Sequence, residues 1–146
     1  MKLQSPAFAN NKILPSEYTC DGLNINPPLI ISGVPDQAKS LVLIFLDLDS
    51  MMDVWTHWLL YNIDPATTII EANSSPKGVI AGLNSFGLAA YGGPCPPTKI
   101  HRYIFKLYAL DSMLELPPGA DKDKLETAIR GHVLAQSQLI GLYKRK

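Results

Sequence analysis

The stretch Gly92–Leu110, GGPCPPTKIHRYIFKLYAL, changes character at its midpoint. Its first half holds three prolines and a cysteine, and its second half is almost entirely apolar after His101 and Arg102. Because proline fixes φ and donates no backbone hydrogen bond, the first half cannot lie inside a sheet ladder. The second half, Tyr103–Leu110, is typical of a buried strand. The stretch therefore predicts a stiff loop that leads into a buried strand, with polar residues where the two meet.

Two segments upstream also predict strands. LVLIFLD (Leu41–Asp47) is apolar and ends on a carboxylate, and WTHWLLYNI (Trp55–Ile63) is rich in aromatic and branched residues. The first forty residues carry turn signals every few positions, and residues 71–93 are rich in Gly, Ser and Asn. These regions predict loops, long connections or short edge strands.

The C-terminal part of the chain predicts helix. From Asp121 onward the apolar residues have helical spacing, and Asp123 with Glu126 is placed as a capping box. Gly131 is expected to break this helix, and the segment 132–143, HVLAQSQLIGLY, predicts a second one. The expected outline is a mainly β domain with helices at its C-terminal end.

Composition narrows the class of protein. A length of 146 residues suits a single domain, 1–146, and equal numbers of basic and acidic residues, 13 of each, exclude the charge excess of a nucleic-acid binder. The longest apolar run, Leu41–Leu46, is too short to cross a bilayer, and the first twenty residues lack the apolar core of a signal peptide. We expect a cytoplasmic protein that needs no cofactor.

The two cysteines, Cys20 and Cys95, match no zinc-binding spacing. Spacing alone leaves two interpretations open. They are either two reduced thiols, as is usual in a cytosol, or the two halves of one disulfide.

Side-chain alternation along the predicted strands collects polar residues at the strand ends. Residues two apart face the same side, so Trp55 and His57 should share a face, as should His101 and Tyr103. By the same rule Leu59 and Tyr61 should lie on the His57 face, Arg102 should point away from His101, and Asp47 should share the face of Leu41, Leu43 and Phe45. Each strand thus carries one titratable residue near its end, Asp47, His57 or His101. Such residues either line a ligand pocket or are polar residues with purely structural partners.

Five sequence blocks, taken together and in order, are similar to the phosphatidylethanolamine-binding protein family in its short bacterial and archaeal form. The blocks are YTCDGLNINPPLIISGVP (Tyr18–Pro35), LIFLDLDSM (Leu43–Met51), WTHW (Trp55–Trp58), YGGPCPPTKIHRYIFKLYALD (Tyr91–Asp111) and AIRGHVLAQSQLIGLY (Ala128–Tyr143). They cover nearly the whole chain. The resemblance implies a large antiparallel-rich β-sheet packed on a smaller sheet, with peripheral C-terminal helices, and a small anion pocket at one end of the large sheet.

The resemblance also assigns residues to that pocket. The ligand-binding set that it implies is Asp47, Trp55, His57, Pro94, His101 and Tyr103, with Gly92–Pro97 as a stiff rim. Because the blocks around Cys20 and Cys95 both border the implied pocket, we expect these cysteines to lie close together and to form a disulfide. Two departures stand out: Leu48 and Met51 occupy positions where the family has prolines, and Lys99 stands where it has a glycine.

The favoured function is therefore a non-enzymatic binding and regulatory protein that holds a phosphate or carboxylate. Through its surface loops it would inhibit a serine protease or regulate a kinase, as the resemblance implies, and a homodimer is an assembly that the sequence leaves open. Two alternatives compete with this function. One is a hydrolase with Cys95 as nucleophile and His101 as base, and the other is a metal site of Asp47, His57 and His101.

Overall fold

The computed structural model describes residues 1–51 and 53–146 and consists mainly of two β-sheets. Its elements are β1 (Lys2–Gln4), β2 (Lys12–Ile13), a 3-10 turn (Ser16–Tyr18), β3 (Leu29–Ser32), β4 (Ser40–Asp47), β5 (Trp55–Ile63), β6 (Ile69–Ile70), β7 (Ile80–Ala81), β8 (His101–Leu110), α1 (Lys122–Ile129) and β9 (Val133–Tyr143). The large sheet has the order β2-β9-β8-β4-β5-β7, and the small sheet has the order β1-β3-β6. The expected fold class is confirmed.

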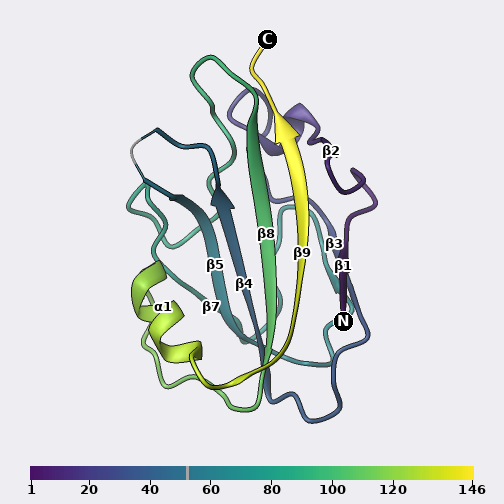
Figure 1. The fold of residues 1–146 in the computed structure, drawn as a ribbon, viewed down its shortest axis with the longest axis vertical. Coiled ribbons are helices and arrows are strands. Elements are labelled where there is room, and N and C mark those ends of the chain that lie inside the picture. The colour runs from purple at the N-terminus through teal and green to yellow at the C-terminus, as the bar shows by residue number, and fades with distance from the viewer. Residues whose placement is uncertain (52) are drawn as a thin grey trace.

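The large sheet separates two apolar layers. On one side, β1 and β3 cover it, and the buried side chains between the sheets include Leu43, Phe45 and Phe105. On the other side, α1 covers it, and Val42, Ile44 and Leu125 are buried there. Figure 1 shows α1 and the small sheet on opposite sides of the long strands. Strand β4 is buried along its whole length because it has a layer on each face and a strand on each edge.

Antiparallel pairing brings three strand ends together. Strand β4 pairs with β5 and with β8, and Asp47 at its end lies opposite both Trp55 and Tyr103. Strand β4 therefore ends where β5 and β8 begin. The titratable residues that the sequence places near the strand ends, Asp47, His57 and His101, therefore lie at one edge of the sheet.

The second predicted helix is wrong. Residues Val133–Tyr143 form β9, which pairs with β8 in an antiparallel ladder from Val133 to Tyr143. Its buried residues near the end, Leu139, Gly141 and Tyr143, alternate as a strand requires. The backbone N–H and C=O groups along the edge of β8 need hydrogen-bonding partners. Pairing with β9 supplies them, and this long-range pairing outweighs the local helical signal.

The capping box of α1 is also wrong. The N-cap is Asp121, whose side chain accepts a hydrogen bond from the backbone N–H of Lys124 at 2.9 Å. Asp123, the cap expected from the sequence, lies inside the first turn. Gly131 has a positive φ of 78° and follows the end of the helix, so its predicted role as a breaker is confirmed.

None of the described residues belongs to a helix that is long and apolar enough to cross a membrane.

The two aspartates at the start of α1 allow a matched test of the cap. We expect Asp121→Ala to lower the free energy of unfolding by about 1 kcal/mol, because the first turn loses its side-chain acceptor. Asp123→Ala should change it by well under half of that. Urea denaturation of both variants measures the difference, and equal effects would contradict the assigned cap.

Candidate functional site

A cavity of about 470 Å³ opens where β4 ends and β5 and β8 begin. It is lined by Asp47, Ser50, Met51, Trp55, His57, Phe86, Cys95, Pro96, Pro97 and His101. We call it the histidine cavity. Four of the residues implied by the family resemblance thus lie on one cavity: Asp47, Trp55, His57 and His101. Asp47, His57 and His101 place a few polar groups in a largely apolar wall, which is the usual composition of a small-molecule site.

A bulge in β5 aims His57 into this cavity. Phe45 of β4 pairs with Trp58, whereas Leu46 pairs with Thr56, so His57 is an extra residue on β5. As a result His57 and Trp58 both face the layer between the sheets. The expectation that His57 shares a face with Leu59 and Tyr61 is wrong, because those two residues pack in the opposite layer. Bulges reverse the alternation of a strand beyond the inserted residue.

His57 is held by the rim loop. Its Nδ1 lies 2.6 Å from the carbonyl oxygen of Gly92, and the N–H of Gly92 donates to the carbonyl of His57 at 3.0 Å. The ring also packs near Phe45 and Tyr103, with centroid distances of 5.4 Å to each. Burial lowers the pKa of His57, and the Gly92 carbonyl and Asp47 oppose that effect only in part. The neutral imidazole is therefore the favoured form.

His101 is oriented by Asp47. The Nδ1 of His101 lies 2.8 Å from Oδ2 of Asp47, and both side chains are only 8% exposed. The other carboxylate oxygen of Asp47 accepts the N–H of Asp49 at 2.8 Å. Both oxygens of Asp47 are thus engaged, and the Nε2 edge of His101 is left for the histidine cavity, which this residue lines.

The loop after β4 lacks the two prolines of the family pattern and is held by an ion pair. Asp49 accepts hydrogen bonds from Arg102, whose Nε and terminal nitrogen lie 3.0 and 2.8 Å from the two carboxylate oxygens. These bonds lower the pKa of Asp49 to about 2. Arg102 is exposed and points away from His101, as the alternation of β8 predicts. This ion pair, with two parallel hydrogen bonds, therefore holds the loop near Leu48, where the family pattern has a proline.

The rim loop lies too close to its neighbours for side chains at two positions. A Cβ on Gly92 would lie 2.5 Å from the ring of Phe86, and one on Gly93 would lie 2.3 Å from Oδ1 of Asn24. The loop is also tied to residues 18–24, because the N–H of Cys20 donates to the carbonyl of Pro94 at 3.1 Å. A disulfide joins Cys20 to Cys95, with the Cα atoms 5.5 Å apart. The rim is therefore fastened both to β5 and to the N-terminal segment.

Tyr103 and Pro94 do not line the histidine cavity, although the resemblance implied both as ligand contacts. Tyr103 lies beneath the histidines, and its ring centroid is 6.2 Å from that of His101. Its hydroxyl is buried and has no hydrogen-bond partner among the described residues. Burial raises the pKa of Tyr103 well above its ordinary value, and the negative charge of Asp47 adds to this effect. Pro94 is buried within the rim, so both residues support the wall from behind.

Phe86 is a lining residue that sequence reasoning missed. Its ring lies 5.4 Å from that of Trp55 and 5.6 Å from that of His57, in both cases close to edge-on. The only local signal was an aromatic residue in a stretch of small and polar ones, and such a residue has no assigned partner until the chain folds.

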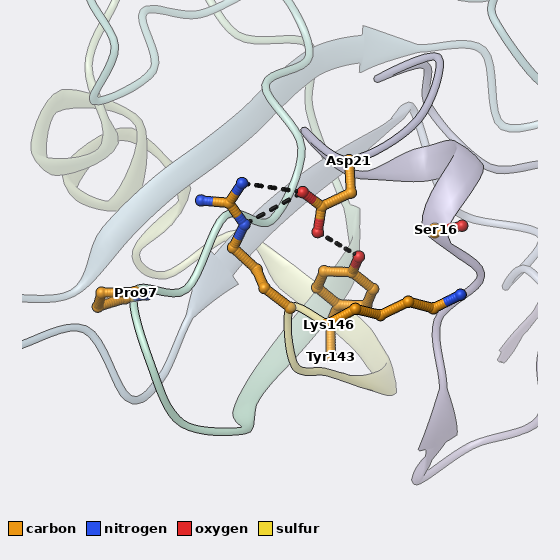
Figure 2. Close-up of a pocket in the computed structure, with 6 residues that line it drawn as sticks. Ser16, Asp21, Pro97, Tyr143 and Lys146 are labelled. Carbon is orange, nitrogen blue, oxygen red and sulfur yellow. Dashed lines mark hydrogen bonds and ion pairs between the residues drawn. The ribbon is translucent and has the colours of Figure 1, made fainter.

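A second cavity, of about 490 Å³, shares Pro97 with the first. Figure 2 shows Asp21 at its centre, where it pairs with Arg145 at 3.0 Å and accepts a hydrogen bond from the Tyr143 hydroxyl at 2.6 Å. These hydrogen bonds lower the pKa of Asp21, with the Tyr143 hydroxyl as the largest cause. Because Asp21 neutralises Arg145, this cavity offers less net positive charge than its basic residues suggest. The histidine cavity is the better candidate.

Neither alternative function is supported by the geometry. Among residues 1–51 and 53–146, no group of three or more His, Cys, Asp or Glu side chains could hold a metal ion, so Asp47, His57 and His101 do not form the metal site considered above. The hydrolase alternative needs a thiolate at Cys95, and the disulfide removes that thiol.

Comparison with known protein families identifies a family model that matches this chain. The model of the family described as Phosphatidylethanolamine-binding protein matches residues 4–144. A UPF0098 protein of Methanothermobacter thermautotrophicus is 50% identical, and the match covers 99% of each chain. A UPF0098 protein of Pyrococcus horikoshii is 47% identical over 97% of this chain and 76% of its own.

Solved structures agree with this match. A phosphatidylethanolamine-binding protein homologue of Chlamydia trachomatis superimposes with a TM-score of 0.95 at 39% identity, covering 99% of this chain and 97% of its own. An Escherichia coli protein, described as a new member of the mammalian family, superimposes with a TM-score of 0.92 at 27% identity, covering 99% and 98%.

The disulfide should stabilise the fold measurably. It closes a loop of 75 positions, for which the chain-entropy model gives about 4.5 kcal/mol. We expect dithiothreitol to lower the urea midpoint of the native chain and to leave that of the double variant Cys20→Ala/Cys95→Ala unchanged. A native midpoint that ignores the reductant would contradict a stabilising disulfide.

Proposed function

We propose that this chain, which belongs to the phosphatidylethanolamine-binding protein family, is a non-enzymatic binding and regulatory protein that holds a small anion in the histidine cavity. The observation that carries this proposal is the pair of buried histidines, His57 and His101, at the mouth of a largely apolar pocket. Phosphate and carboxylate are the anions of suitable size and charge. Family membership supports a binding or regulatory role in general, and the anion is our specific assignment.

The charges in the cavity suit an anion once a histidine is protonated. His101 then forms an ion pair with Asp47 through Nδ1, and its second N–H is free to donate to a ligand oxygen. The positive charge of a protonated His101 offsets the negative charge of Asp47, whose two oxygens both accept hydrogen bonds. The role of Asp47 in this proposal is to orient the ring, as carboxylates do for functional histidines.

Calorimetry with inorganic phosphate tests this function. We expect binding near the millimolar range, which corresponds to about 4 kcal/mol. Affinity should rise as pH falls, because protonation turns an accepting ring nitrogen into a charge-assisted donor. His101→Ala should weaken binding by about tenfold or more, since hydrogen bonds to charged groups contribute about 1.5–3 kcal/mol.

His132→Ala is the matched control. His132 is exposed, pairs with Asp111 at 2.7 Å and does not line the histidine cavity, so its loss should leave phosphate affinity unchanged. Phosphate affinity that is the same in the native chain and in His101→Ala would contradict the proposed site.

The partner classes that we propose are a serine protease or a protein kinase, contacted through the loops around the cavity, inside the cytoplasm. The exposed side chains of Met51 and Phe86 give the loops around the cavity an apolar surface. Inhibition of a purified chymotrypsin-type protease or a protein kinase by the native chain, and weaker inhibition by Met51→Asp, would support this role. If the native chain inhibits neither class at micromolar concentration, the regulatory part of the proposal is wrong while the anion site stands.

A further inference from the structure

A further cavity, of about 340 Å³, opens beside β5 and shares no lining residue with the histidine cavity. Its walls come from the loop before β3, from β5, from the connection between β6 and β7, from β7 and from the residues just before Gly92. Three asparagines border it, so we call it the amide cavity. None of the residues that line it has a charged side chain. This composition differs from that of the histidine cavity, which is lined by a carboxylate and two imidazoles.

The floor of the amide cavity is apolar and uncharged. Trp58 and Leu60 of β5 line it and are only 3% and 1% exposed. Tyr91 packs edge-on against Trp58, with the ring centroids 5.4 Å apart, and its hydroxyl donates to the carbonyl of Tyr18 at 2.7 Å. Burial raises the pKa of Tyr91, so its phenol stays neutral.

The indole N–H of Trp58 is available to a ligand in this cavity. It makes no hydrogen bond within residues 1–51 and 53–146, and among these residues only Tyr103 has a side-chain polar atom that is both sealed from solvent and unpaired. The indole N–H must therefore reach solvent. Because the rest of Trp58 is buried and the residue lines the amide cavity, its N–H opens there. A ligand oxygen would satisfy a donor that the fold leaves to water.

The mouth of the cavity carries amides and hydroxyls. Asn24 accepts the N–H of Gly93 at 2.8 Å through its side-chain oxygen, which leaves its NH₂ group for other partners. The side chains of Asn73, Ser74 and Ser75 are exposed at the opposite wall. Amides and hydroxyls offer both donors and acceptors. No lining group could compensate a charged ligand for its lost hydration, so the cavity favours a neutral, hydrogen-bonding one.

Asn26 holds this mouth in place. Its side chain is 5% exposed, donates to the carbonyl of Glu71 at 2.9 Å and accepts the N–H of Ser74 at 3.0 Å. The N–H of Asn73 also donates to the carbonyl of Asn26 at 3.1 Å. The polar groups are thus fixed before a ligand arrives, which lowers the entropy cost of binding.

We propose that the amide cavity is a second binding site and that its ligand class is an uncharged polyhydroxyl ring, the size of one monosaccharide. One hydroxyl accepts from the indole N–H of Trp58, others exchange hydrogen bonds with the amides and hydroxyls at the mouth, and the C–H face packs on Leu60 and Tyr91. The volume lies near the lower end of the range for small-molecule sites, about 300–1,000 Å³, which suits a single ring. This site is independent of the proposed anion site.

The two tryptophans of the chain report on the two cavities separately, because Trp55 lines the histidine cavity and Trp58 lines the amide cavity. Each gives one indole signal in a proton–nitrogen correlation spectrum of the full-length protein. We expect at least one of the methyl glycosides of glucose, galactose and mannose to shift the Trp58 signal with millimolar affinity and to leave the Trp55 signal in place.

Inorganic phosphate should do the reverse, so failure of one site is distinguishable from failure of the other. If none of the three glycosides shifts the Trp58 signal at tens of millimolar, the inference is wrong, whatever phosphate does at Trp55.

The uronate of the best-binding sugar tests the requirement for a neutral ligand. It keeps the ring and replaces one CH₂OH group by a carboxylate. We expect its methyl glycoside to bind at the Trp58 signal about tenfold more weakly or worse, because the cavity has no cation to replace the water lost by the carboxylate. Equal affinity of the two compounds at this signal would overturn the assigned ligand class.

Ala90→Phe tests the site without altering the core. Ala90 is exposed and lines the amide cavity, so a phenylalanine there should occupy the space and abolish the shift of the Trp58 signal by the sugar. Ala66→Phe is the matched control, because Ala66 is also exposed and does not line this cavity. An unchanged melting temperature shows that both variants are folded. A full response of Ala90→Phe to the sugar would overturn the site.

Trp58→Phe tests the assigned donor. It keeps an aromatic ring in the floor and removes the indole N–H. Calorimetry should show the sugar binding about three- to tenfold more weakly, as expected for the loss of one hydrogen bond between neutral groups. Unchanged affinity would overturn the role of the indole N–H.

Discussion

The extra residue that β5 carries opposite β4 is the feature on which the site depends. Without the bulge at His57, strict alternation would turn this side chain away from the layer between the sheets, because Trp58 already faces that layer. With the bulge, His57 reaches the Gly92 carbonyl, and the rim loop gains a fixed attachment to the sheet. The bulge therefore supplies one of the two attachments that hold the rim over the cavity, and the disulfide to the N-terminal segment supplies the other.

The polar groups at this edge are held in a connected arrangement. Asp47 joins the end of β4 to His101 and to the loop that follows it, and Asp49 joins that loop to Arg102. Buried polar groups are costly unless they are paired, so each of these bonds both satisfies a group and orients its neighbour. The Tyr103 hydroxyl is the exception among the described residues, because it is buried beneath the cavity without a partner.

The departures from the family pattern have structural replacements in this chain. Where prolines would stiffen the loop after β4, a forked ion pair between Asp49 and Arg102 ties it to β8. The disulfide from Cys20 to Cys95 fastens the rim on its other side. Two cavities meet at Pro97, and only the histidine cavity joins ionisable groups to an apolar wall. A binding role at this edge therefore fits the family to which the chain belongs.

By itself the sequence determined β4, β5 and β8 within a residue or two at each end, because long apolar runs specify burial locally. One polar residue near each of three strand ends, together with the family resemblance, then predicted that Asp47, His57, His101 and Tyr103 would meet at one end of the sheet. Tertiary structure alone decided that Val133–Tyr143 is a strand, because its local pattern fits a helix and only the open edge of β8 requires a ladder there. It also decided the bulge at His57 and the approach of Phe86, because each depends on the register between segments that are distant in the chain.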